Sequence, residues 1–167
     1  MYDKLTRSDI QKMEEEIEHR KVVVRHELLE HVKVARAQGD LSENFEYHAA
    51  KKEKNQNEGR IRFLERMIKT AIIVEEESRT DEVGINNTVE VLFEEDQTTE
   101  KFRIVTTMRQ NSLKNLISVE SPMGKALMKH KVGDKVHIQV NDQYGYDVTI
   151  QSIDQLDDGS DDEIRSF

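Results

Sequence analysis

The sequence predicts an α+β protein in which an antiparallel helical hairpin precedes a small, largely antiparallel β domain with one short helix. Three observations predict this fold class. Residues 8–37 contain no Gly or Pro and place apolar residues every three or four positions. A second helical pattern follows after a very short gap, and beyond residue 79 the apolar period changes to two. The 167 residues, 35% of them apolar, suffice for one medium domain or two small ones.

The first helix is expected to run from Ser8, as its N-cap, to the glycine at position 39. Its buried face follows from the three-or-four spacing of its apolar residues. These are Ile10, Met13, Ile17, Val24, Leu28, Val32 and Ala35.

The second helix is expected from about Ser42 to Val74, and only Asp40 and Leu41 separate it from the first. Such a short connection requires antiparallel neighbours, so residues whose numbers sum to about 81 should face each other. The stretch 51–60 is polar and contains a glycine, so we expect the seam to be weakest there. Its expected apolar face comprises Phe45, which should pack against Ala35, followed by Ala49, Ile61, Leu64, Ile68 and Ile72.

The second half alternates apolar and polar residues in four segments, which predicts four strands. A short helix is expected at residues 121–129, capped by Ser121 with Pro122 in its first position. We therefore expect a hairpin domain at residues 1–76 with its tip at 38–44, a β domain at 80–156 and a disordered acidic tail at 157–167. The expected strands are 88–93, 101–105, 135–140 and 146–153.

Composition and charge exclude several classes of protein. The chain has no cysteine, no apolar run near the roughly 20 residues of a membrane helix and no apolar export signal at its start, so we expect a cytoplasmic protein without a membrane. Residues 77–167 carry 10 basic and 18 acidic side chains, which favours a protein partner over nucleic acid there. Between residues 19 and 38 basic side chains outnumber acidic ones, which fits either a nucleic-acid contact or a solvated helix face.

Motifs of a self-contained enzyme are missing from the sequence. His26 and His31 are five residues apart, so they do not share a helix face as two zinc ligands of a helical motif must. Neither a phosphate-binding glycine loop nor a Gly-x-Ser-x-Gly nucleophile elbow is present. The sequence therefore argues against catalysis by this chain alone.

The expected tip of the hairpin contains two acids three residues apart, Asp40 and Glu43. One interpretation is a capping box, in which both side chains satisfy free amides at the start of the second helix. The other is a pair of carboxylates whose remaining oxygens converge on a hard cation, since Mg²⁺ takes only one or two protein carboxylates and keeps several waters. Both interpretations remain open on the spacing alone.

Two longer motifs contain or accompany these acids. The run Gly39-Asp40-Leu41-Ser42-Glu43-Asn44-Phe45-Glu46-Tyr47-His48-Ala49-Ala50-Lys51, followed by Glu58-Gly59-Arg60-Ile61, closely resembles the bacterial Gre transcript-cleavage factors of the GreA type. Val119-Glu120-Ser121-Pro122-Met123-Gly124-Lys125-Ala126-Leu127 and Val132-Gly133-Asp134 resemble the C-terminal signature of the same family. The resemblance covers nearly the whole chain apart from the acidic tail.

The resemblance implies a coiled-coil hairpin followed by an FKBP-like domain, and a monomer that binds RNA polymerase through its secondary channel. It implies that Asp40 and Glu43 hold magnesium only together with the polymerase active centre, where backtracked nascent RNA is cleaved. Arg36, Lys51 and Lys52 would contact the RNA 3′ end or the channel wall, and polymerase binding would involve Ser121, Pro122, Met123 and Gly124. The alternatives are an anti-cleavage Gre relative that inhibits polymerase, or an FKBP-like chaperone or adaptor. An outward-facing Phe45 could also contact RNA or polymerase.

Overall fold

The computed structural model of the chain describes residues 4–39, 44–75, 81–155 and 162–165. The chain forms two compact units, one containing Ile10–Ala71 and the other containing the residues from Ile72 onward together with the described residues before Ile10. The first unit is a pair of long helices, and the second is a five-stranded mixed sheet with a short helix. The predicted α+β fold class is thus confirmed. No helix in the described ranges is long and apolar enough to span a membrane.

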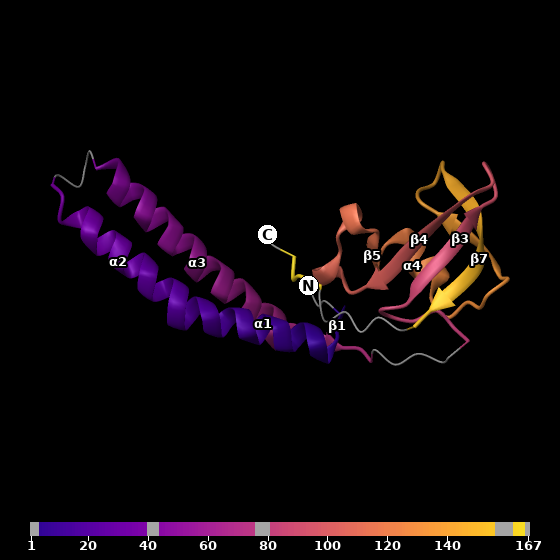
Figure 1. Cartoon of the computed structure of the whole chain (residues 1–167), viewed down its shortest axis with the longest axis horizontal. Helices are drawn as coiled ribbons and strands as arrows, with labels where there is room; N and C mark the ends of the chain where they lie inside the picture. The colour runs from indigo at the N-terminus through magenta and orange to yellow at the C-terminus, as the bar shows by residue number, and fades with distance from the viewer. Residues whose placement is uncertain (1–3, 40–43, 76–80, 156–161, 166–167) are drawn as a thin grey trace. The chain divides into compact units, whose positions relative to one another are not determined.

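The first unit is an antiparallel hairpin (Figure 1). One arm consists of α1 (Arg7–His19), a π-helical segment η1 (Arg20–Val24) and α2 (Arg25–Arg36), and the other arm is α3 (Phe45–Thr70). The expectation of one uniform first helix is therefore wrong at η1, where the wider π turn interrupts the α-helical phase. The second helix ends at Thr70 rather than Val74, because Ile72–Ile73 form the short strand β2.

The seam between the arms is apolar near both ends of the hairpin. Every apolar position expected on the first arm is at least half buried, and Met13 and Ala35 are fully buried. On the second arm the expectation was wrong at Phe45, which is 86% exposed, and at Ala49, which is also exposed, while Tyr47 takes the buried position. It was also wrong at Ile72, which lies beyond α3 in β2 and is exposed. The buried residues of α3 are Tyr47, Asn57, Ile61, Leu64 and Met67.

The middle of the hairpin is held by polar contacts instead. Glu16 accepts hydrogen bonds from Nε of Arg20 and Nε of Arg60, both at 2.8 Å. The Arg20 guanidinium also donates to Oδ1 of the buried Asn57 at 3.0 Å. Arg25 forms two parallel hydrogen bonds with the Glu58 carboxylate, at 2.7 and 2.8 Å. These contacts join the arms across η1, where the sequence offers few apolar partners.

The second unit is built on a sheet with the strand order β5-β4-β3-β7-β6 (Figure 1). β5 pairs parallel with β4, and the other neighbours are antiparallel. The four predicted strands are present, whereas β5 and the parallel pair of β1 (Lys4–Leu5) with β2 were missed. The strands of the sheet are β3 (Thr88–Phe93), β4 (Thr98–Val105), β5 (Leu116–Ser118), β6 (Lys135–Gln139) and β7 (Gly145–Asp154).

Alternate residues of the central strands form one apolar core under α4 (Pro122–Leu127). The side chain of Ser121 caps α4 by accepting from the Gly124 amide at 3.0 Å, and Pro122 occupies the first turn, as the sequence predicts. The core residues are Val83, Val89, Val91, Ile104, Leu127, Val136, Ile138, Val148 and Ile150.

A buried polar cluster also belongs to the second unit. The α1 cap is Thr6 rather than the expected Ser8, because Thr6 Oγ1 accepts from the Asp9 amide and Asp9 Oδ2 accepts from the Thr6 amide, at 3.2 and 3.0 Å. Asp9 additionally accepts from Thr106 Oγ1 at 2.6 Å and lies 2.7 Å from Nε of Arg109. The side chains of Asp9 and Arg109 are completely buried.

Candidate functional site

The hairpin tip is the candidate site, and its two acids, Asp40 and Glu43, lie outside the residues that the structure describes. The end of α2 is described. The amide of Ala37 donates to Lys33 O and that of Gln38 to Ala35 O, both at 3.2 Å. Gly39 then adopts a φ of +134°, a conformation that side-chain-bearing residues rarely adopt. The glycine predicted to end the first arm is thus required by the backbone.

Asn44 fixes the other side of the tip. Its Oδ1 accepts from the Tyr47 amide at 3.0 Å, which makes Asn44 the N-cap of α3. Its Nδ2 donates to the Ala35 carbonyl of the opposite arm at 2.7 Å. Asn44 therefore occupies the N-cap position of α3, whereas the capping interpretation of Asp40 and Glu43 falls on residues outside the described ranges. Sequence reasoning missed Asn44, although asparagine directly before a helical run is itself a capping signal.

A cation–π contact joins the last residue of α2 to the first turn of α3. The Arg36 guanidinium carbon lies 5.7 Å from the centre of the Tyr47 ring. A hydrogen bond from Arg36 lowers the pKa of the Tyr47 hydroxyl, and the positive charge of Lys51 adds to this effect. Lys51 and Lys52 are exposed in the first turns of α3. The end of α2 and the first turns of α3 thus present three basic side chains, Arg36, Lys51 and Lys52.

The Ser121–Gly124 segment has a clear structural role. Ser121 Oγ donates to Ser118 O at 2.6 Å while it caps α4. A Cβ on Gly124 would lie 2.1 Å from the same carbonyl oxygen, so only glycine fits there. Met123 is half buried against the core and Pro122 is exposed. The structure therefore explains Ser121 and Gly124 by packing, and Pro122 is the member of the segment that is most available to a partner.

Metal-binding capacity at the tip rests on the kinds of donor present. In the described ranges no three His, Cys, Asp or Glu side chains gather as a metal site. Asp40 and Glu43 would supply hard carboxylate oxygens, the donors that Mg²⁺ prefers. The Asn44 oxygen is already committed to the Tyr47 amide. The donor set therefore fits magnesium in kind, with two carboxylates at most from this segment.

Comparison with protein families places the chain. Residues 4–73 match the family described as "Transcription elongation factor, N-terminal", and residues 77–155 match "Transcription elongation factor, GreA/GreB, C-term". Together the two matches span the hairpin and the sheet. The chain therefore belongs to the GreA/GreB family of transcription elongation factors.

Two curated GreA proteins agree with this assignment. Transcription elongation factor GreA of Thermoanaerobacter pseudethanolicus is 46% identical over 81% of this chain and 87% of its own length. GreA of Bacillus velezensis is 40% identical over 81% of this chain and 86% of its own length. Among solved structures, GreA factor homolog 1 (Gfh1) of Thermus thermophilus is 26% identical, with a TM-score of 0.42, over 92% of this chain and 99% of that one.

Proposed function

We propose that this chain stimulates the cleavage of backtracked nascent RNA by RNA polymerase, with Asp40 and Glu43 delivered to the polymerase active centre at the tip of the hairpin. Its family membership supports the partner and the process. The observation that carries the assignment of the site is the Asn44 cap. Because Asn44 already occupies the N-cap position of α3 and bonds the Tyr47 amide, neither acid is needed at that position.

The hairpin is long enough to reach into a channel of a large partner. The 26 residues of α3 correspond to roughly 40 Å of helix at 1.5 Å per residue. An arm of this length can carry its tip deep into a channel of a large partner, such as the secondary channel of the polymerase. The hydrogen bond from Asn44 to the Ala35 carbonyl joins the end of one arm to the start of the other.

The chemistry at the tip is that of carboxylate ligands. Asp40 and Glu43 would hold a magnesium ion together with acidic residues of the polymerase, because two carboxylates alone bind Mg²⁺ weakly. Such an ion would supply the activated water of a two-metal phosphodiester cleavage, in which a second ion stabilises the leaving oxygen. The chain is thus a cofactor that completes an active site and is inert towards RNA alone.

Other surfaces take supporting roles. Arg36, Lys51 and Lys52 would attract the RNA 3′ end or the channel wall through their positive charge. Of the Ser121–Gly124 segment, Pro122 is exposed and would contact polymerase, whereas Ser121 and Gly124 maintain the helix that presents it. We expect the factor to act as a monomer in the bacterial cytoplasm.

A cleavage assay on backtracked elongation complexes tests this proposal. The parent protein with Mg²⁺ should shorten end-labelled RNA, and Asp40→Asn and Glu43→Gln should each reduce the rate by at least about tenfold while polymerase binding is retained. Glu46→Gln is the matched control, because Glu46 is an exposed acid in the first turn of α3 that should leave cleavage unchanged.

Two results would contradict the proposal. Cleavage by the Asp40 and Glu43 variants at the parental rate would refute the assignment of the site. Inhibition of intrinsic cleavage by the parent would instead favour an anti-cleavage relative. Folding of each variant is checked by circular dichroism, so that a loss of activity is not a loss of structure.

A further inference from the structure

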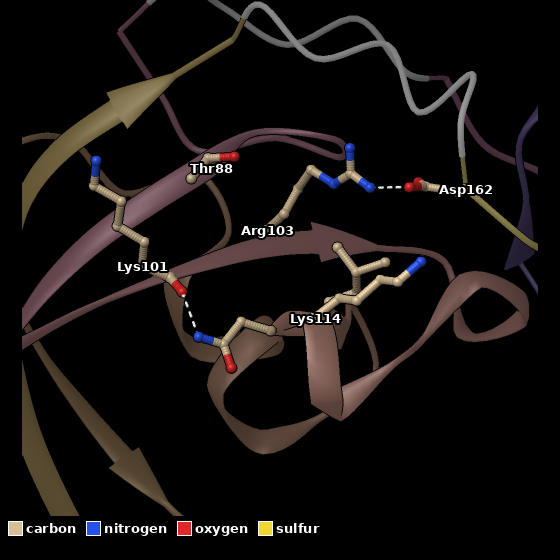
Figure 2. A pocket seen from close by; sticks show the side chains of 7 residues that line it. Thr88, Lys101, Arg103, Lys114 and Asp162 are labelled. Atoms are coloured by element: carbon tan, nitrogen blue, oxygen red, sulfur yellow. Dashed lines mark hydrogen bonds and ion pairs between the residues drawn. The ribbon is translucent and has the colours of Figure 1, made fainter.

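A cavity of about 440 Å³ opens on the β3–β4–β5 end of the sheet in the second unit. None of the residues that line it has been given a role above, and most of its lining side chains are polar. Figure 2 shows Arg103 and Asp162 pointing toward each other across it. The lining residues are Thr88, Lys101, Arg103, Lys114, Asn115, Leu116 and Asp162.

Asp162 lines one side of this cavity and is held there by two arginines, as a bound carboxylate would be. Its side chain is only 5% exposed, and its two oxygens engage two different arginines. Oδ1 accepts from Nη2 of Arg103, and Oδ2 lies 3.0 Å from Nη1 of Arg109. The backbone near Asp162 is also bound to the second unit, because the Arg165 amide donates to Met108 O at 2.6 Å. This arrangement was missed because Asp162 lies in the segment that the sequence predicts as a disordered tail.

The cavity is a basic site within an acidic half of the chain. Three of the ten Lys and Arg residues among positions 77–167 line it, namely Lys101, Arg103 and Lys114, while Arg109 binds Asp162 from behind and is also paired with Asp9. Lys101 is exposed and lies 3.8 Å from Glu90, and Lys114 makes no ion pair with a carboxylate in the described part of the chain. The two lysines at the rim therefore leave positive charge available for further acids.

We infer that this cavity is a binding site for acidic peptide segments and that the carboxylate of Asp162 engages its arginines in the free protein. Positions 157–163 contain five acids among seven residues, which complements the basic rim. A partner segment rich in Asp or Glu would bind by displacing Asp162 from Arg103 and Arg109. The inference does not depend on the activity proposed for the hairpin tip.

Peptide binding to the full-length chain tests this inference. The probe is a fluorescent peptide with the sequence of residues 156–165. The parent should not bind it at micromolar concentrations, because a tethered segment competes at an effective concentration on the order of millimolar. Asp162→Ala should bind it at least about tenfold more tightly, since charge-assisted bonds to two vacated arginines become available. Asp162→Asn, which retains one acceptor, serves as a milder second variant.

Charge-reversal variants locate the binding. In the Asp162→Ala background, Lys101→Glu/Lys114→Glu should weaken peptide binding about tenfold or more. The matched control is Lys129→Glu/Lys135→Glu, which changes the net charge equally at exposed positions outside the cavity and should bind like the Asp162→Ala parent. A peptide with Asn in place of its Asp162 should bind more weakly than the unchanged peptide.

The inference would be overturned by any of four results: equal binding to the parent and to Asp162→Ala, no binding to folded Asp162→Ala and Asp162→Asn proteins, equal weakening by both charge-reversal pairs, or preferential binding of single-stranded RNA over the peptide. Circular dichroism and thermal unfolding establish that each variant is folded.

Discussion

Two polar networks in this molecule differ in their exposure to water. The network across the middle of the hairpin, which joins Glu16, Arg20 and Arg60, is partly open to water: the Glu16 side chain is 25% exposed. The network of the second unit, centred on Asp9 and Arg109, is completely buried. Even there satisfaction is incomplete, because Nη2 of Arg109 finds no hydrogen-bond acceptor in the described part of the chain. The hairpin uses ion pairs where apolar residues are scarce, whereas the second unit buries charge inside a good core.

The difference shows why ion pairs cannot be ranked by distance. The shortest Glu16–arginine contact is 2.8 Å and the Asp9–Arg109 contact is 2.7 Å, yet their surroundings differ greatly. A partner lost in the hairpin can be replaced by water, so the cost is modest. A partner lost in the buried cluster leaves an uncompensated charge in a medium of low dielectric constant. Four experiments test this contrast, from the largest expected effect to the smallest.

Substitution Arg109→Met should cost about 3–5 kcal/mol in the free energy of unfolding, because Asp9 remains buried without its cation. Urea unfolding followed by circular dichroism measures this. The control is the double variant Asp9→Asn/Arg109→Met, in which the buried charge is also removed and part of the stability should return. A loss below about 1 kcal/mol for Arg109→Met would mean that burial does not govern the cluster.

Two glycine substitutions extend the contrast to packing. Gly124→Ala should destabilise by about 1–3 kcal/mol, because the new Cβ would lie 2.1 Å from Ser118 O in the second unit. Gly59→Ala should stabilise by about 0.5–1 kcal/mol, because Gly59 lies inside α3 and the nearest atom to a Cβ there is 4.0 Å away. Chemical denaturation of both variants checks the opposite signs. Equal effects would show that the hairpin is packed as tightly as the sheet.

The hairpin network should respond to acid. Burial raises the pKa of Glu16, but hydrogen bonds from Arg60 and Arg20 outweigh it, so the pKa lies below its usual value of 4.5. A lowered pKa stabilises the fold above the unfolded value, and this contribution is lost as the pH falls below 4.5 and through the folded value. Glu16→Gln should cost roughly 1–2 kcal/mol at pH 7 and flatten the stability profile below pH 5. An unchanged acid limb in this variant would place the effect elsewhere.

The sequence predicts the elements whose residues repeat regularly, and it fails where a contact from elsewhere decides. Ser121 and Pro122 predict the start of α4, because capping signals depend only on neighbouring residues. On α3 the stretch 51–60 is polar, so the apolar pattern that begins at Ile61 does not show which residue near the tip faces the other arm. The sequence therefore predicts Phe45 as the buried residue, whereas the structure buries Tyr47. Strands of two or three residues, such as β5, are too short to show a period.

The candidate site divides in the same way. The terminating Gly39 is predicted from the sequence, because a glycine after a helical run is a local signal. The pair of carboxylates is also a local signal, and its assignment as the site stays a prediction. The tie from Asn44 to Ala35 joins residues from opposite arms, and the insertion of Asp162 between Arg103 and Arg109 depends on the folded sheet. Neither leaves a trace in a single sequence.

His137 forms the most exposed of the polar contacts compared here. Its Nε2 lies 2.8 Å from Gln139 Oε1 and its Nδ1 lies 2.8 Å from Asp147 Oδ1. Gln139 donates its amide protons to the carbonyls of Asn141 and Tyr144, which keeps its oxygen toward the imidazole. Both ring nitrogens therefore face acceptors, and only the doubly protonated ring can donate to both.

The hydrogen bonds that His137 donates, first to Gln139 and then to Asp147, raise its pKa above 6.5. Because the pKa is raised on folding, the contribution to stability is complete below 6.5 and disappears as the pH rises through the folded value. Nuclear magnetic resonance titration of the imidazole should show this shift, and Asp147→Asn should lower the pKa. Because the ring is exposed, the accompanying change in stability should be the smallest of the four. A normal pKa in the parent would show that water competes successfully for both nitrogens, whereas a raised one shows that a fixed pair of acceptors holds a proton even at the surface.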